Sequence, residues 1–166
     1  MDTSSKVLVL PNICGIELVS SAAISTSKTP SLQPFYNTIV QNGVAQPAYV
    51  TISKVSYSER GKSTRAGVSF EQKLQLQFPS NDPLRVQRIH DFLKAKYIYI
   101  RTSTGMVFFF GRNDGIQNAA PKIDITSTEK HTQITYTIES MAPIGFTNGS
   151  FEFQLAEGFP VNFYNL

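Results

Sequence analysis

The sequence predicts a mainly β protein, an antiparallel β-sandwich or strongly bent sheet with one α-helix packed against it. Three observations lead to this fold class. Segments with apolar residues at every second position recur along the chain, turn residues separate these segments, and an apolar stripe with helical spacing lies at residues 83–95. With 166 residues, the chain is long enough for one domain whose core needs no disulfide.

The clearest strand pattern runs from Val68 to Phe78. Apolar side chains occupy its even positions, with the exception of Gln72, and polar side chains occupy its odd positions. Because side chains alternate across a strand, this pattern puts one apolar face inward and one polar face outward. Pro79 has no N–H group to donate and therefore ends the strand.

The helix is expected over residues 83–95. Asp82 is a suitable N-cap, and Pro83 stands at the first helical position, where its missing N–H costs nothing. Apolar residues then follow on one side at helical spacing, so this side is expected to lie on a sheet. These residues are Val86, Ile89, Phe92 and Leu93.

A tight hairpin is expected between residues 97 and 111. Residues 97–100 are aromatic or β-branched, and residues 102–105 supply a turn in which Gly105 can adopt a positive φ. Residues 106–110 are uninterruptedly apolar, and Gly111 ends the run. A run this short and this apolar indicates a strand covered on both faces.

Further strands are expected before and after this region. They cover residues 6–10, 13–19, 35–40, 44–57, 122–126, 131–141 and 150–155. Asn42-Gly43 and Asn148-Gly149 are strong hairpin signals between them. The chain is thus expected to be one β-rich domain, residues 1–166, with an extended N-terminal arm over about 1–34 and a C-terminal tail over about 156–166.

The composition favours a surface that neighbouring proteins cover. Charged residues make up 16% of the chain, well below the usual quarter, and small polar residues replace them. The net charge of +3 is weak and spread along the chain, which does not by itself indicate a nucleic-acid-binding protein. The sequence shows neither a signal peptide nor an apolar run of about 18 residues, so no membrane span is expected.

Residues 58–67 are predicted to form a charged, flexible hairpin tip carrying Arg60, Lys62 and Arg65. Gly61-Lys62-Ser63 is similar to the end of a phosphate-binding loop, but the motif requires a glycine where Ser56 stands, and strands flank both sides. We therefore interpret the three basic residues as a loop that faces a neighbouring subunit or DNA phosphates, with a solvated tip as the alternative.

No residue pattern indicates an enzyme. Cys14 is the only cysteine and is expected to be a buried structural thiol, and the two histidines, His90 and His131, stand apart from each other. No nucleophile elbow, metal-ligand cluster or calcium loop is present in the sequence. We therefore expect no catalytic residues, no metal and no cofactor.

The region from Phe70 to Ile144 resembles a group of small virion proteins of tailed phages that infect Bacteroidetes, including crAss-like phages. The likeness lies in an alternating strand, a short helix, a Tyr-Ile-Tyr-Ile strand, a Thr104-Gly105 turn, a strand ending at Gly111 and a last alternating strand. It implies a tail or head–tail connector subunit, located in the virion and made in the bacterial cytoplasm. The implied partners are copies of itself in a ring or tube, other virion proteins of the tail or portal region, and packaged DNA through non-specific contacts.

Two further expectations follow from the ends of the chain and from its aromatic residues. The apolar C-terminal tail is predicted to dock on the chain itself or on a partner, through Phe159, Val161, Phe163 and Tyr164. The alternative function is a glycan-binding or tail-tip adhesion β-sandwich, in which Tyr97, Tyr99 and Phe108 would form a stacking platform. A nucleic-acid binder with steep salt dependence is the third hypothesis.

Overall fold

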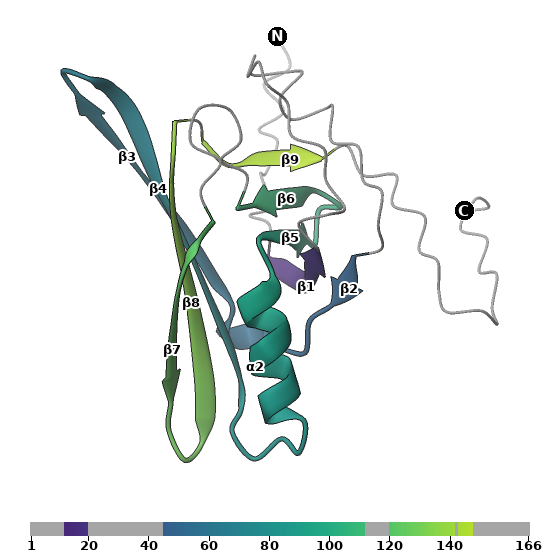
Figure 1. Cartoon of the computed structure of the whole chain (residues 1–166). Coiled ribbons are helices and arrows are strands. Elements are labelled where there is room, and N and C mark those ends of the chain that lie inside the picture. Colours follow the sequence, from purple (N-terminus) through teal and green to yellow (C-terminus); the bar gives the residue numbers. More distant parts are fainter. Residues whose placement is uncertain (1–11, 20–44, 112–119, 142, 148–166) are drawn as a thin grey trace, which may run out of the picture.

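A computed structural model of the chain describes residues 12–19, 45–111, 120–141 and 143–147. These residues form two antiparallel sheets and one α-helix, which confirms the predicted class (Figure 1). The elements are β1 (Ile13–Val19), β2 (Gln46–Pro47), the 3-10 helix η2 (Ile52–Lys54), β3 (Ser56–Thr64), β4 (Gly67–Pro79), α2 (Arg85–Lys94), β5 (Tyr97–Thr102), β6 (Val107–Phe110), β7 (Lys122–Ser127), β8 (His131–Ser140) and β9 (Gly145–Thr147).

The strands form a five-stranded sheet in the order β2-β1-β5-β6-β9 and a four-stranded sheet in the order β3-β4-β8-β7. All neighbouring strands are antiparallel. Figure 1 shows helix α2 beside β8 and below β5, β6 and β9. No helix in the described part of the chain is long and apolar enough to cross a membrane.

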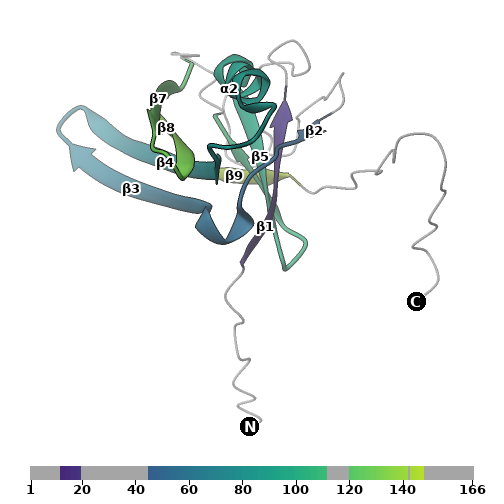
Figure 2. The same cartoon turned by 90° about the horizontal axis from the view of Figure 1, so that it is seen from below.

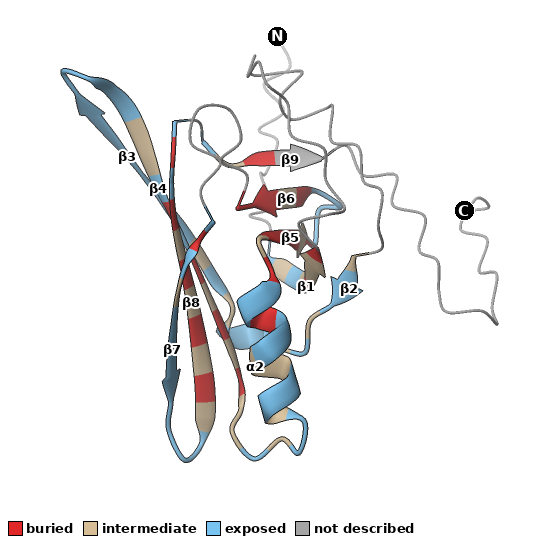
Figure 3. Cartoon of the chain, viewed as in Figure 1, coloured by how far each residue is buried: buried red, intermediate tan, exposed pale blue. Residues whose placement is uncertain are grey.

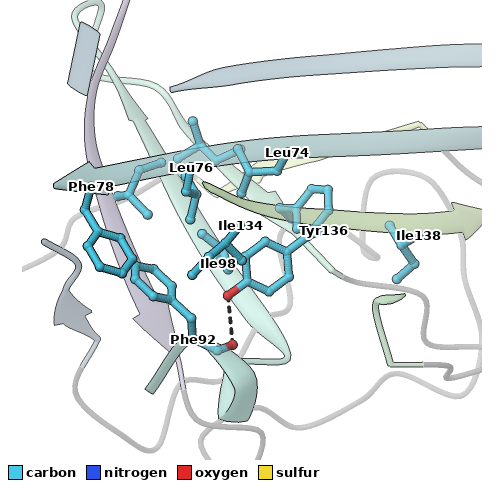
Figure 4. Close-up of a cluster of buried hydrophobic side chains, with 11 residues drawn as sticks. Leu74, Leu76, Phe78, Phe92, Ile98, Ile134, Tyr136 and Ile138 are labelled. Carbon is cyan, nitrogen blue, oxygen red and sulfur yellow. Dashed lines mark hydrogen bonds between the residues drawn. The ribbon is translucent and has the colours of Figure 1, made fainter. Parts of the chain in front are cut away.

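The main core lies between the two sheets and the helix (Figure 4). The predicted inward residues of β8 and of the second half of β4 are buried there, including Leu74, Leu76 and Tyr136. The prediction is wrong for Val68, which is exposed, and Phe70 is only half-buried. The ring of Phe92 from α2 stacks on Phe78 at a centroid distance of 5.9 Å. The hydroxyl of Tyr136 donates a 2.8 Å hydrogen bond to the carbonyl of Phe92, and burial raises the pKa of this hydroxyl. The end of the helix is therefore fixed to the four-stranded sheet.

The predicted start of the helix is wrong by two residues. The helix begins at Arg85 with Leu84 as its N-cap. Asp82 still serves the helix start, because its carboxylate accepts a 2.9 Å hydrogen bond from the Leu84 N–H and pairs with Arg88. The Leu84 hydrogen bond and then Arg88 hold the pKa of Asp82 below its ordinary value of 3.8.

The predicted inner face of the helix is correct for Ile89 and Phe92, which pack against the main core, and wrong for the other two residues. Phe92 is buried, but Val86 is 78% exposed and Leu93 is 50% exposed. Phe92 lies about 120° around the helix from Val86, so one face cannot bury both. Arg85 lies on the Phe92 side, where its guanidinium donates hydrogen bonds to the hydroxyls of Thr132 and Ser127. The body of the protein therefore contacts a face of the helix made of Arg85, Ile89 and Phe92 and leaves Val86 and Leu93 outside.

The β5–β6 hairpin agrees with the prediction. Gly105 and Gly111 have positive φ values of 82° and 92°. One face of the hairpin packs into the main core, and the other face forms a second buried cluster. The second cluster consists of Val19, Tyr97, Tyr99, Val107 and Phe109. Both faces of the β5–β6 hairpin are thus buried, as the continuous apolar run indicates.

Two further predictions are wrong. Residues 44–57 do not form one strand, because this segment crosses from one sheet to the other. The Ala48 N–H donates to Ile16 in β1, and the Thr51 N–H donates to Gln77 in β4. Cys14 is exposed rather than buried, since a register shift between Ile13 and Gly15 leaves it outside the regular ladder of β1.

Several predicted elements lie outside the described residues. They are the strands at 6–10, 35–40 and 150–155, the turns at Asn42-Gly43 and Asn148-Gly149, and the C-terminal tail. Within the range assigned to the N-terminal arm, β1 is described as a strand of the five-stranded sheet, paired with β2 and β5.

Candidate functional site

The hairpin of β3 and β4 is the element that extends farthest from the described body (Figures 1 and 2). Its two strands pair from Ser56–Gln75 to Thr64–Gly67, whereas pairing of β4 with β8 begins only at Phe70–Ser140. Residues 61–69 therefore form a two-stranded ribbon with no third strand in the described structure. Its tip is exposed (Figure 3). A ribbon of two strands is only marginally stable in water, so a binding partner would stabilise it.

The three predicted basic residues lie on this hairpin, but not on an irregular loop. Arg60 and Lys62 are in β3, opposite Glu71 and Ser69 of β4, and Arg65 is in the turn that connects the strands. The prediction of a flexible tip over residues 58–67 is wrong for residues 58–64, because they belong to strand β3 and pair with β4. The polar side chains of β3 continue the polar face of β4. Arg60 and Lys62 consequently point to the same face.

The opposite face of the hairpin is partly apolar. Val68 is 49% exposed. Phe70 lies across from Gly61, and a Cβ atom on that glycine would come within 3.2 Å of the Phe70 ring. The glycine thus leaves space for the aromatic ring of the neighbouring strand, which is a different role from that in a phosphate-binding loop. The hairpin therefore presents a basic face and an apolar face to its surroundings.

A carboxylate at the base of the hairpin joins it to the body. One oxygen of Glu59 accepts hydrogen bonds from the hydroxyl of Tyr57 at 3.2 Å, from the side-chain amide of Gln72 at 3.1 Å and from the N–H of Ile144 at 2.6 Å. Sequence reasoning missed this cluster. The available signal was Gln72 itself, since a polar residue at an inward position of a strand requires a hydrogen-bond partner.

Replacing Glu59 with alanine is expected to destabilise the protein by about 1–3 kcal/mol, because three donors lose an acceptor. The variant Glu59→Gln keeps an acceptor oxygen and is expected to lose less. Denaturant unfolding measures both values, and trypsin cleavage at Arg60, Lys62 and Arg65 reports local opening of the hairpin. Equal stability of the alanine variant and the natural chain would contradict this role of Glu59.

Both outer strands of the four-stranded sheet, β3 and β7, are paired on one side only within the described structure. Residues of β3 are exposed except for Tyr57, and residues of β7 are exposed except for Ile123. Unpaired backbone N–H and C=O groups of this kind can bind a strand of another chain. Among the described residues, no strand pairs with the outer edge of the hairpin, so this edge could bind a strand of a partner.

The predicted stacking platform for glycans is wrong. Tyr97 and Tyr99 are buried, and Phe108 belongs to the opposite face of the sheet, because Phe108 pairs with Ile100 and Phe109 pairs with Tyr99. Burial, followed by the charge of Glu17, raises the pKa of Tyr99 to about 12. These side chains therefore belong to the core and do not form a sugar-binding surface.

The described residues include no group of three or more His, Cys, Asp or Glu side chains that could hold a metal ion. The predicted docking residues Phe159, Val161, Phe163 and Tyr164 lie outside the described residues. Comparison of the chain with models of protein families, with curated proteins and with solved structures gives no match.

Proposed function

We propose that the protein is a structural subunit of a tailed-phage virion that assembles into a ring or tube in the tail or the head–tail connector. The observation that carries this proposal is the projecting β3–β4 hairpin with its open edge and its partly exposed Val68. The resemblance to small phage virion proteins and the low charged fraction of 16% support the same function.

The arrangement of the four-stranded sheet suits contacts that close into a ring. Its four strands alternate in direction, so β3 and β7 run in opposite directions. Strand β7 of one copy and β3 of the next copy would therefore run antiparallel when placed side by side. Such a contact joins two different surfaces, and repeated contacts of this type form rings or filaments.

The basic face of the hairpin is a second feature that supports the proposal. Arg60 and Lys62 share a face, and Arg65 is at the tip. In an assembly these residues would contact acidic groups of a neighbouring subunit, or phosphates of DNA in the lumen. Either partner makes the contact sensitive to salt.

Replacing Arg60, Lys62 and Arg65 together with serine tests the role of the hairpin. The association constant of each subunit contact is expected to fall at least about tenfold, or about 1.4 kcal/mol, and fewer particles should assemble at a given protein concentration. The control variant carries Lys54, Lys94 and Lys130 replaced with serine, which removes the same charge from exposed positions elsewhere. Negative-stain microscopy counts particles for both. Unchanged assembly and DNA retention in the hairpin variant would contradict the proposal.

A further inference from the structure

The free edge of β3 is an interaction surface with two chemically distinct sides. On one side the hairpin carries Arg60 and Lys62, and on the other it carries Val68 and Phe70 beside the small residue Gly61. A strand that fits this edge must be apolar on one face, because that face would cover Val68 and Phe70. It must also offer backbone N–H groups toward β3.

Residues 159–164 of the chain have the sequence properties that this edge requires. Phe159, Val161 and Phe163 occur at every second position, so an extended conformation puts their side chains on one face. Their N–H groups would then all point to one edge of the segment. Pro160 lacks an N–H group, and this gap would lie on the opposite edge. Proline at this position permits pairing with β3 and prevents the addition of a further strand.

We propose that the C-terminal segment 159–164 of a second copy of the chain pairs with β3 and extends the hairpin to three strands. This inference rests on the proposed function as an assembling subunit and specifies one of its contacts. The hairpin projects away from the described body (Figure 2), so a neighbouring copy could reach the edge of β3 that is unpaired there. The three apolar side chains would lie next to the small residues Gly61 and Ser63 of β3 and reach over them toward Val68, which is 49% exposed, and the half-buried Phe70 of β4.

Charge and chain length agree with this pairing. The segment 159–164 is uncharged, and residues 148–158 before it contain Glu152 and Glu157 and no lysine or arginine, whereas the hairpin carries Arg60, Lys62 and Arg65. The described structure reaches Thr147 in β9, and the residues between it and the segment, 148–158, can span roughly 40 Å when extended. The segment is thus long enough to reach an adjacent subunit.

A disulfide cross-link between full-length chains tests the contact. In a Cys14→Ser background, one chain carries Ser63→Cys on the hairpin and the other carries Val161→Cys. The control pair replaces Ser63→Cys with Thr126→Cys on the exposed edge of β7. Oxidation of the mixed chains is expected to give at least about ten times more heterodimer with the hairpin cysteine than with the control, because paired strands bring their side chains within reach. Equal yields for both pairs would overturn the inference.

Two proline variants of the full chain test the backbone pairing itself. Val161→Pro removes an N–H that is expected to point at β3, while Asn162→Pro removes one that points away. Assembly is expected to be lost with Val161→Pro and retained with Asn162→Pro. Loss in both variants, or in neither, would overturn the proposed pairing.

The cross-link also separates this inference from the proposed function. A chain carrying both Ser63→Cys and Val161→Cys that closes the disulfide within one molecule would overturn pairing with a second copy. Ring or tube formation without the hairpin cross-link would overturn the inference alone. Failure of the natural chain to assemble at all would contradict the proposed function.

Discussion

Replacing Gly111 with alanine is expected to lower the free energy of unfolding by about 3 kcal/mol or more, the largest backbone effect in the described structure. Gly111 ends the β5–β6 hairpin with a φ of 92°, a conformation that L residues rarely adopt. A Cβ atom at this position would overlap the backbone carbonyl oxygen of Lys96. Backbone atoms cannot move aside as a flexible side chain can, so the hairpin itself must shift.

Gly105→Ala is the matched control for this prediction. Gly105 also has a positive φ, 82°, but a Cβ atom added to it would have no neighbouring atom within 4 Å. Its replacement is therefore expected to cost only about 1 kcal/mol, the strain of the left-handed conformation alone. Thermal or denaturant unfolding of both variants separates strain from steric overlap. Equal losses in the two variants would contradict the close approach of Gly111 to Lys96.

Replacing Phe92 with alanine is expected to destabilise the protein by about 3–5 kcal/mol, because it leaves a cavity in the main core. Phe92 is the buried side chain of α2 and stacks on Phe78. Its loss removes the main apolar contact of the helix with the core, although the hydrogen bonds of Arg85 and the one from Tyr136 to the carbonyl oxygen of residue 92 can persist. Denaturant unfolding measures the change.

Val86→Ala is the control on the same helix. The helical spacing in the sequence predicts Val86 as a core residue, but its side chain is 78% exposed. Its replacement is therefore expected to change stability by no more than about 0.5 kcal/mol. A large loss at Val86 together with a small loss at Phe92 would show that the helix binds the sheets through its aliphatic face.

Local patterns predicted the strands whose burial alternates regularly. Strand β8 is an example, with Ile134, Tyr136 and Ile138 inward. It pairs with β4 on one side and β7 on the other, and one of its faces is covered by the core, so only one orientation of its side chains buries the apolar residues. The β5–β6 hairpin was predictable for a related reason, since its turn glycine and its continuous apolar runs are both local signals.

The helix face was not predictable because two apolar stripes compete. Phe92 and the aliphatic residues Val86 and Leu93 lie on different sides, and spacing alone does not say which side the sheets contact. Tertiary partners decide it: Ser127 and Thr132 bind Arg85, and Phe78 stacks on Phe92. These partners belong to other elements, so the hydrophobic pattern of the helix carries no information about them.

The hairpin site was predictable in composition but not in geometry. The basic residues stand out in the sequence, and their strand conformation follows only from pairing with β4. The contact of Glu59 with Ile144 joins residues 85 positions apart, which no local pattern reveals. Sequence reasoning therefore found the part of the chain that we propose to bind a partner, but not how the body holds it in place.

The size of the full-length chain in solution tests the central claim most directly. Mass photometry over a range of protein concentrations is expected to show particles containing several copies, with masses at whole-number multiples of the subunit. Raising the salt concentration should shift the population toward smaller species, because charged hairpin contacts weaken. A chain that remains a single copy at every concentration, with its hairpin resistant to trypsin, would contradict the account.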